Sequence, residues 1–491
     1  MRWVTATLIV CLCPGFVFAQ GGLGGGGGGI GGGGGGIGGG GGGGIGGGGG
    51  VGNNLPAGIA INPDGVVSNI QYKAPSPKLA KKQREALAKT HLSADVNAWA
   101  EMRCVSLVKL QAELEKLVEA DSDIPFDMQY LAGLQRIDFV FALPEEGDLI
   151  LAGPAEGFAP GPSGRPLGIT TARPPLRLDD LLVALRAVAK GGELGCSIDP
   201  VPANLARTQS WIKANSTAAT TQVVKARYEK MAQILGLQDV TVWGLPEDSH
   251  LANVLVEADY RMKQVVMGHE NPRVKGFKSH LTMLKPGKGS LFRWWFIPLY
   301  DKFETNADST AWRFAGQRAQ LLSQEEYANA AGQRFAKPHT AQSANKFAKQ
   351  FTERFYELSQ NIAVFSELQN AFDLTVFAAL MKKHDVVERI GWDMSLFMDA
   401  ERLPSEKLVP AKQIPSSANC KRQGSRLVLG ILGGGVVISP RQVLEEDAEE
   451  TPRMGRALAV AAELRGERWW WDAVVPKVEK SKTRKGRKSR K

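Results

Sequence analysis

The chain has 491 residues, of which 43% are hydrophobic and 22% charged, and its formal net charge is +10. An apolar share of this size is that of a folded protein and excludes a chain that is disordered throughout. Residues 477–491 carry nine basic side chains against the single acid Glu479, a local net charge of +8 that leaves about +2 for the rest. The overall charge therefore does not indicate a basic groove on the folded part.

The first nineteen residues have the pattern of a secretory signal peptide. Arg2 supplies the positive charge, residues 4–18 are mostly apolar, and the small residue Ala19 precedes Gln20. This segment is too short to span a membrane, for which about 20 apolar residues are needed. We expect cleavage between Ala19 and Gln20 and export to the periplasm, the cell envelope or the medium.

Residues 20–52 are almost pure glycine. The only aliphatic interruptions are Leu23, Ile30, Ile37, Ile45 and Val51. Glycine disfavours a helix and has no side chain to pack, so we predict a disordered linker that tethers the folded part. Self-association through the spaced aliphatic residues is the alternative.

Three cysteines remain once the signal peptide is removed: Cys104, Cys196 and Cys420. An odd number of widely spaced cysteines does not indicate a disulfide framework. We expect three buried thiols, with one bridge and one thiol as the alternative. No later stretch reaches about 18 uninterrupted apolar residues, so we expect no transmembrane helix in the mature chain.

The first half of the folded part is predicted to mix hairpins and helices. In chain order we expect a hairpin over 58–67, helices over 78–89 and 94–119, a hairpin over 137–151, a Gly/Pro-rich loop over 153–175, a helix from Asp179 to Lys190 and a strand over 194–198. Ser93 is the expected cap of the second helix.

The second half is predicted to contain longer helices. We expect helices over 217–235 and 250–267, strands over 240–243 and 290–299, and a last helix over 452–464. Phenylalanines at helical spacing predict an antiparallel helix pair over 347–362 and 365–380, with a joint near Asn361. Residues 427–438 read as one or two buried strands, broken at the glycines 433–435.

Strands and helices do not alternate regularly along the chain, which disfavours a doubly wound sheet. We predict a mixed α+β fold with hairpins, a mixed sheet and the long helix pair. The expected divisions are a signal peptide at 1–19, a linker at 20–52, a hairpin and helices at 53–125, an α+β domain at 126–245, a second α+β region at 246–475 and a disordered basic tail at 476–491.

Complete motifs for cofactors are missing from the sequence. Residues 287–290 resemble a phosphate-binding loop but lack its first glycine and its final Lys-Ser/Thr pair. No two of the six histidines lie four residues apart, and the mature chain has no C-x-x-C. The serine elbow G-x-S-x-G is also missing. We expect neither a metal nor another cofactor.

Six charged residues form the candidate polar cluster: Asp148, Glu156, Arg177, Asp179, Asp259 and Arg261. Within the helix 250–267, the i,i+4 spacing pairs Glu257 with Arg261 and Asp259 with Lys263. We interpret these pairs as a solvated helix face, with a cluster lining a cleft as the alternative. Cys196 is interpreted as a small buried hydrophobe, with an activated thiol as the alternative.

Two short runs combine arginine with tryptophan, at 293–296 and 468–471. Such runs can stack on sugars or bases. Because neighbouring residues of a strand face opposite ways, Trp294 and Trp295 do not share one surface. We favour core packing for the first run, and for the second a role in sealing the end of the fold.

The basic tail is predicted to be disordered and to bind polyanions. Its cations are Lys480, Lys482, Arg484, Lys485, Arg487, Lys488, Arg490 and Lys491, with Lys477 just before them. Behind an export signal, the expected partner is an anionic envelope polymer or a lipid surface. Nucleic acid is possible but not favoured.

Several segments together resemble a family of exported planctomycete proteins of unknown function. The segments are DLILAGPAEG at 148–157, RLDDLLVALR at 177–186, CSIDP at 196–200, EADYRMK at 257–263, RWWF at 293–296 and FAKQFTERF at 347–355. The resemblance covers about 130–380 and implies a bacterial envelope or secreted setting. It assigns no activity, so no catalytic role transfers to any residue.

These observations predict a non-enzymatic envelope protein with a tether, an α+β body and a cationic tail. The first alternative is an envelope hydrolase whose site is assembled from distant carboxylates or Cys196. The second is an exported nucleic-acid-binding protein. The oligomeric state is not predicted.

Overall fold

The structure is a computed structural model. It describes residues 54–73, 76–161, 163–215, 217, 220–284, 290–416, 419–423, 426–463 and 470–474. The predicted signal peptide, glycine linker and basic tail lie outside these residues. The described residues belong to one compact unit.

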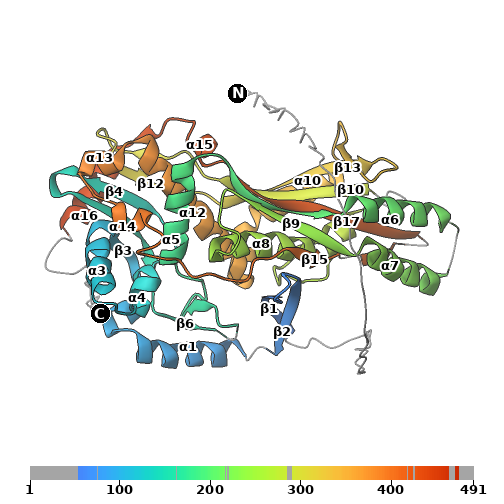
Figure 1. The fold of residues 1–491 in the computed structure, drawn as a ribbon, viewed down its shortest axis with the longest axis horizontal. Helices are drawn as coiled ribbons and strands as arrows, with labels where there is room; N and C mark the ends of the chain where they lie inside the picture. The colour runs from blue at the N-terminus through green and yellow to red at the C-terminus, as the bar shows by residue number, and fades with distance from the viewer. Residues whose placement is uncertain are drawn as a thin grey trace, which may run out of the picture. The chain divides into compact units, whose positions relative to one another are not determined.

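Most strands belong to two large sheets (Figure 1). The eight-stranded sheet has the order β14 (Arg334–Ala336), β13 (Arg318–Ala328), β10 (Ser290–Leu299), β17 (Arg426–Ile438), β8 (Leu194–Pro200), β9 (Leu237–Trp243) and β15 (Gln413–Pro415), with β16 (Asn419–Gln423) also paired to β17. It is mixed, because β10 runs parallel to β17 while β8 pairs with β17 in the antiparallel sense. Strands from the predicted ranges 126–245 and 246–475 therefore share one sheet.

The second sheet has seven strands and lies at the other end of the view in Figure 1. Its order is β18 (Glu449–Glu450), β11 (Glu304–Thr305), β12 (Ala311–Arg313), β4 (Phe139–Leu143), β5 (Asp148–Ala155), β3 (Ala100–Ser106) and β19 (Trp471–Val474). Two small hairpins form sheets of their own, β1 (Asn54–Ile61) with β2 (Val67–Lys73), and β6 (Phe158–Pro160) with β7 (Pro166–Gly168). The turn of the first hairpin is bonded to β15, where the Gln413 amide donates to the Gly65 carbonyl at 3.1 Å.

Helices cover and separate the sheets. Their bounds are α1 Pro77–His91, α2 Ala94–Asn97, α3 Leu107–Glu119, α4 Phe126–Gln129, α5 Leu178–Lys190, α6 Pro202–Ala214, α7 Thr221–Leu235, α8 His250–Met267, α9 His280–Met283, α10 Gln342–Glu353, α11 Phe355–Asn361, α12 Ala363–Lys383, α13 Val386–Ile390, α14 Ser395–Met398, α15 Pro440–Val443 and α16 Pro452–Glu463. Two short 3₁₀ helices span Leu131–Gly133 and Pro144–Glu146.

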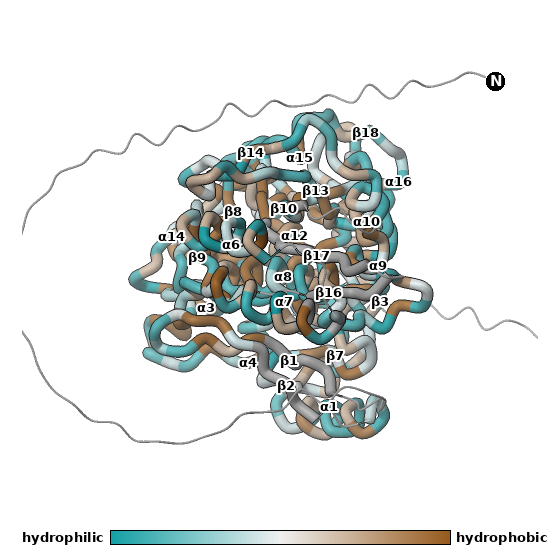
Figure 2. Tube along the Cα trace, turned by 90° about the vertical axis from the view of Figure 1, so that its right-hand side faces the viewer, coloured by the Kyte–Doolittle hydropathy of each residue, from teal (hydrophilic) through white to brown (hydrophobic). Residues whose placement is uncertain are grey.

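The core is built around α8 and α12. All residues of α12 from Val364 to Met381 are buried, so this helix is enclosed on every side. It packs against α5 and α8, and α8 packs in turn against β8 and β17. Hydrophobic segments gather at these central elements in Figure 2, while the outer loops are mostly hydrophilic. Because α8 and α12 are enclosed, most of the charged side chains that these two helices carry are buried as well.

The structure confirms the predicted α+β class and most of the predicted elements. The hairpins expected at 58–67 and 137–151 correspond to β1–β2 and β4–β5. The two predicted helical segments are present as α10 and α11 followed by α12, with the joint at Ile362, but α10 packs mainly against β13 while α11 packs against α12. The first member is itself interrupted at Arg354. Among the described residues no helix is long and apolar enough to cross a membrane.

The helix predicted over 94–119 is wrong in its middle. The helical periodicity holds for α2 and α3, but the chain between them forms β3. This strand pairs with β5 on one side and β19 on the other. Ser93 caps α2 as expected, and Ser106 caps α3 by accepting a hydrogen bond from the Lys109 amide at 3.1 Å. Pairing with two distant strands outweighs the local helical pattern here.

The break predicted at the glycines of the 427–438 segment is also wrong, because β17 is one continuous strand. The glycines serve close packing instead. A Cβ atom at Gly434 would collide with the carbonyl of Trp294, and one at Gly435 would collide with the carbonyl of Cys196. Glycine at these positions lets neighbouring strands and side chains approach the backbone. The loop predicted over 153–175 likewise contains β6 and β7.

Candidate functional site

Helix α8 carries four charged side chains that are all buried, Glu257, Asp259, Arg261 and Lys263. The two predicted pairs form, with Lys263 Nζ 2.8 Å from Asp259 Oδ2 and Arg261 Nη1 3.6 Å from Glu257 Oε1. All four side chains are buried, so the expectation of a solvated face is wrong. The i,i+4 spacing is correct, but α8 lies between the large sheet and α12 and has no free face.

The pair of Asp259 and Lys263 faces the eight-stranded sheet. Lys263 Nζ also donates to the carbonyl of Ile198 on β8 at 3.2 Å. Asp259 is fully buried, and burial raises the pKa of its carboxyl to about 6 although the Lys263 charge opposes this shift. Gly434 leaves room for the carboxylate next to the strand, because a Cβ atom there would lie 3.2 Å from Asp259 Oδ1.

Arg165, just before β7, contacts two carboxylates, one of them Glu257 on the face of α8 opposite to Asp259. Its Nη2 lies 2.7 Å from Glu257 Oε2, and its Nε lies 3.1 Å from Glu367 Oε1 on α12. Arg261 extends the chain of charges to Glu270, with Nη2 2.5 Å from Oε1. Burial raises the pKa of Glu367, and the charge of Arg165 opposes this shift. The network joins the loop before β7 to both central helices.

An Asp–His pair adjoins this network. His250 Nδ1, in the first turn of α8, lies 3.0 Å from both carboxylate oxygens of Asp180 on α5. The side chains are only 14% and 10% exposed. His250 also lies close enough to Glu367 on α12 to oppose the rise in the pKa of that carboxyl, so α5, α8 and α12 meet around this pair. This pair was not predicted from the sequence, because its members lie 70 residues apart and each residue type is common at the start of a helix.

Arg177 and Asp179 lie together at the start of α5. Arg177 Nη2 contacts Asp179 Oδ2 at 3.2 Å and Glu406 Oε2 at 2.8 Å, and its guanidinium lies over the Tyr130 ring at 5.5 Å. Burial raises the pKa of Asp179, and the Arg177 charge opposes this shift.

The other two predicted carboxylates lie apart from these residues. Asp148 Oδ1 accepts from Ser106 Oγ at 2.6 Å and from the Leu149 amide at 2.8 Å. Glu156 is held by Gln135 Nε2 at 2.6 Å and the Thr170 amide at 2.7 Å. The structure therefore brings Arg177 and Asp179 together, places Asp259 and Arg261 on opposite faces of one helix, and separates Asp148 and Glu156 from them.

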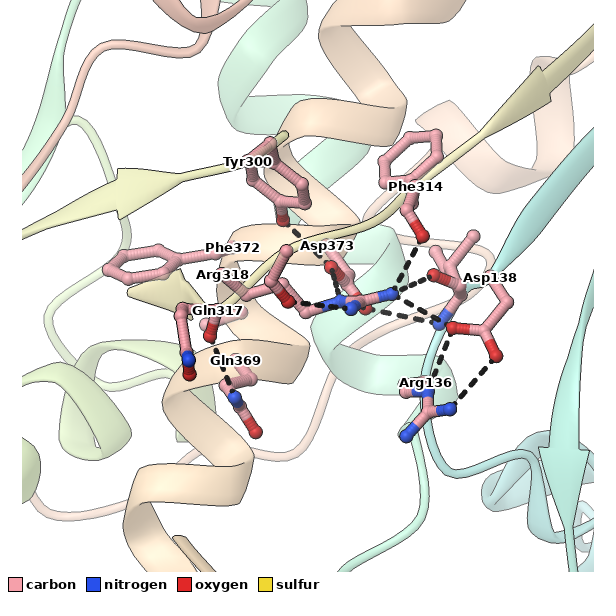
Figure 3. Close-up of polar contacts among 12 residues, drawn as sticks. Arg136, Asp138, Tyr300, Phe314, Gln317, Arg318, Gln369, Phe372 and Asp373 are labelled. Atoms are coloured by element: carbon pink, nitrogen blue, oxygen red, sulfur yellow. Dashed lines mark hydrogen bonds and ion pairs between the residues drawn. The ribbon is translucent and has the colours of Figure 1, made fainter. Parts of the chain in front are cut away.

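A further buried ion pair lies at the centre of Figure 3. Arg318 Nε contacts Asp373 Oδ1 at 3.0 Å, and its Nη2 contacts Asp138 Oδ1 at 2.9 Å and the Ile137 carbonyl at 2.8 Å. Tyr300 donates its hydroxyl to Asp373 at 2.7 Å. Burial raises the pKa of Asp373, and Arg318 opposes this shift. The contacts join α12, β13 and the chain before β4, which makes the cluster a structural clamp.

The described cysteines are buried and free. Cys104 and Cys196 form no disulfide. Burial raises the pKa of Cys104 to about 12 and that of Cys196 further, so neither thiol ionises readily at neutral pH. This contradicts the activated thiol considered for Cys196. The side chain of Cys420 lies outside the described residues.

The arginine–tryptophan runs pack into the core. Trp294 is fully buried between His280 and Phe347, whereas the Arg293 guanidinium lies over the ring of Trp295 at 5.9 Å. Trp470 and Trp471 are also buried. Core packing thus explains Trp294, Trp470 and Trp471 better than an open stacking surface does, whereas Trp295 is only half-buried. Trp469 lies outside the described residues.

No group of three or more His, Cys, Asp or Glu side chains in the described ranges is arranged to hold a metal ion. The buried carboxylates are instead paired with arginine, lysine, histidine or backbone amides. What the arrangement can do chemically is limited to the Asp180–His250–Glu367 group, where a histidine oriented by a carboxylate lies near a second carboxylate with a raised pKa.

Comparison with known proteins gives one match. A family model described as "Protein of unknown function (DUF1598)" matches residues 196–280. A search of curated proteins and a search of solved structures each found no significant match. The matched segment begins within β8, ends at the first residue of α9 and includes the charged helix α8. The comparisons therefore relate this segment to a domain of unknown function.

Proposed function

We propose that this is an exported envelope protein with a non-enzymatic α+β body and a cationic tail that binds an anionic envelope polymer. The observation that carries the proposal is the charge distribution, with a net +8 in residues 477–491 and about +2 in all the rest. A dense, short stretch of cations attracts polyanions regardless of their detailed structure. The signal-like residues 1–19 and the glycine-rich 20–52 fit a tethered protein outside the cytoplasm.

The interior of the body supports a structural role. Its buried charges occur as partners, such as Arg165 with Glu257 and Arg318 with Asp373. A buried charge that loses its partner is strongly destabilising, so these groups are committed to holding elements together. These contacts join α8 to the loop before β7 and α12 to β13.

Binding to dextran sulfate tests the proposal. In one variant the eight cations from Lys480 to Lys491 are replaced by glutamine; in the control, Ser481, Thr483 and Ser489 are replaced by alanine. We expect the first variant to lose retention at low salt and the control to bind like the parent chain, with binding weakening as salt rises. Equal retention of both variants contradicts the proposal. Stronger capture by double-stranded DNA than by dextran sulfate favours the nucleic-acid alternative.

A second candidate, an envelope hydrolase, is favoured by the Asp180–His250 pair beside Glu367. An imidazole oriented by a carboxylate can act as a general base when its other nitrogen reaches a substrate. A panel of chromogenic esters and glycosides, assayed between pH 5 and 9, tests this candidate. Activity that His250→Gln removes and His339→Gln preserves supports it, and turnover no faster than the buffer background contradicts it.

A further inference from the structure

A cavity of about 430 Å³ lies where α5, α12 and α15 meet. It is lined by Val188, Ala379, Lys382, Lys383, Arg441, Leu444 and Glu445. The volume falls in the range typical of small-molecule sites. None of the charge networks described above includes these residues.

The lining combines an apolar floor with a basic rim. Val188, Ala379 and Leu444 supply the floor. Three cations and the single acid Glu445 supply the charges, an excess of two positive charges around a small volume. Such a lining matches a molecule with an apolar body and a negative head.

Each of the two lysines donates one hydrogen bond to a carbonyl near the end of a helix. Lys382 Nζ donates to the carbonyl of Ala189 at 3.0 Å, and Lys383 Nζ donates to the carbonyl of Leu444 at 2.6 Å. Since an ammonium has three N–H groups, each lysine keeps further donors for a ligand. Capping of helix carbonyls accounts for the lysines but not for the third cation.

Arg441, the third cation of the lining, does not cap a helix carbonyl among the described residues. Its side chain is exposed, and its Nη2 lies along Gly191, 3.4 Å from where a Cβ atom would be. Within the described ranges its guanidinium has no hydrogen bond or ion pair. A guanidinium binds carboxylate and phosphate oxygens in pairs, which is the geometry an anionic head would need.

We infer that this cavity binds a small anionic amphiphile, with a carboxylate or phosphate head at Arg441, Lys382 and Lys383 and a short alkyl chain on the apolar floor. The site is independent of the tail and of the proposed binding of polymers. It is formed entirely by described residues of the folded body.

Titration calorimetry on the full chain tests the inference with octanoate, octyl phosphate, octanol and acetate as probes. We expect both anionic amphiphiles to bind, whereas octanol lacks the charge and acetate lacks the chain. The two heads distinguish carboxylate from phosphate as the preferred group. Equal binding of octanol and octanoate overturns the inference, and so does the failure of both anionic probes to bind.

Arg441→Gln should weaken binding of the better probe by about tenfold, because a charge-assisted contact is lost. Arg456→Gln, an exposed arginine on α16, is the matched control and should bind like the parent chain. Ala379→Phe, which fills the cavity, should abolish binding while the thermal midpoint verifies that the variant is folded. Unchanged affinity in Arg441→Gln overturns the inference.

The tail variant separates this site from the proposed function. Replacement of the eight tail cations by glutamine should leave octanoate binding unchanged. If octanoate binding falls in that variant and not in Arg441→Gln, the tail is the binding site and the inference is wrong. If the tail variant loses dextran sulfate binding but still binds octanoate, the result supports a cavity site that is separate from the tail.

Discussion

At the scale of residues, the buried charges are the main feature of the molecule. Asp259 is fully buried and has a single lysine partner, so its ionised form loses hydration that Lys263 only partly replaces. The raised pKa of about 6 follows from this imbalance. Sequence spacing correctly identified the partner but not the burial, because burial depends on a sheet and a helix that are distant in sequence.

Asp259 should make stability depend on pH in a defined direction. Its folded pKa exceeds its unfolded value, so the folded state binds more protons between about pH 4 and 6 and gains stability as pH falls through this window. We expect the stability of the parent chain, relative to Asp259→Asn, to rise between pH 7 and pH 5. Urea unfolding of both proteins at the two pH values measures it. A difference that is constant, or that moves the other way, contradicts the prediction.

At the scale of elements, hydrophobic periodicity predicted those helices and strands whose formation depends mainly on neighbouring residues in the sequence. The amphipathic stripes of α5 and α8 and the alternation in β10 were sufficient to place these elements. β3 was missed because its sequence also fits a helix, and only its pairing with β5 and β19 selects the strand. The Asp180–His250 contact was missed for the same reason, since no periodicity relates residues on two helices.

The glycines of β17 provide a test at this scale. Gly434→Ala places a methyl group against the Trp294 carbonyl, so we expect destabilisation of more than about 3 kcal/mol or failure to fold. Gly455→Ala, on α16 with nothing within 4 Å, should instead stabilise by about 0.5–1 kcal/mol. Thermal unfolding compares the two. Similar effects of both substitutions would show that close packing does not explain the glycine at 434.

At the scale of the whole molecule, central ion pairs connect the two sheets. Arg318 opens β13 of the eight-stranded sheet, Asp138 precedes β4 of the seven-stranded sheet, and Asp373 lies on α12 between these contacts. The ion pairs of Arg318 with Asp373 and Asp138 join residues 55 and 180 positions apart, so no local pattern in the sequence predicts them. The members of the clamp were unremarkable charges in a chain with 22% charged residues.

Removal of the clamp cation should therefore destabilise the whole compact unit. Arg318→Met leaves Asp373 buried without its main partner, and we expect a loss of about 3–5 kcal/mol in the free energy of unfolding. Arg313→Met breaks a more exposed pair with Glu304 and should cost about 1 kcal/mol or less. Urea unfolding gives both values. Equal losses would mean that the Arg318 contacts do not join the sheets.

We propose that the protein works outside the cytoplasm, and this compartment decides which polyanions its cationic tail meets. Mass spectrometry of the amino terminus of the native protein, isolated from cell fractions, tests this most directly. We expect a mature chain that starts at Gln20 and is recovered from the envelope or the medium. An intact Met1 in a cytosolic fraction would contradict it and would make nucleic acid the first partner to examine.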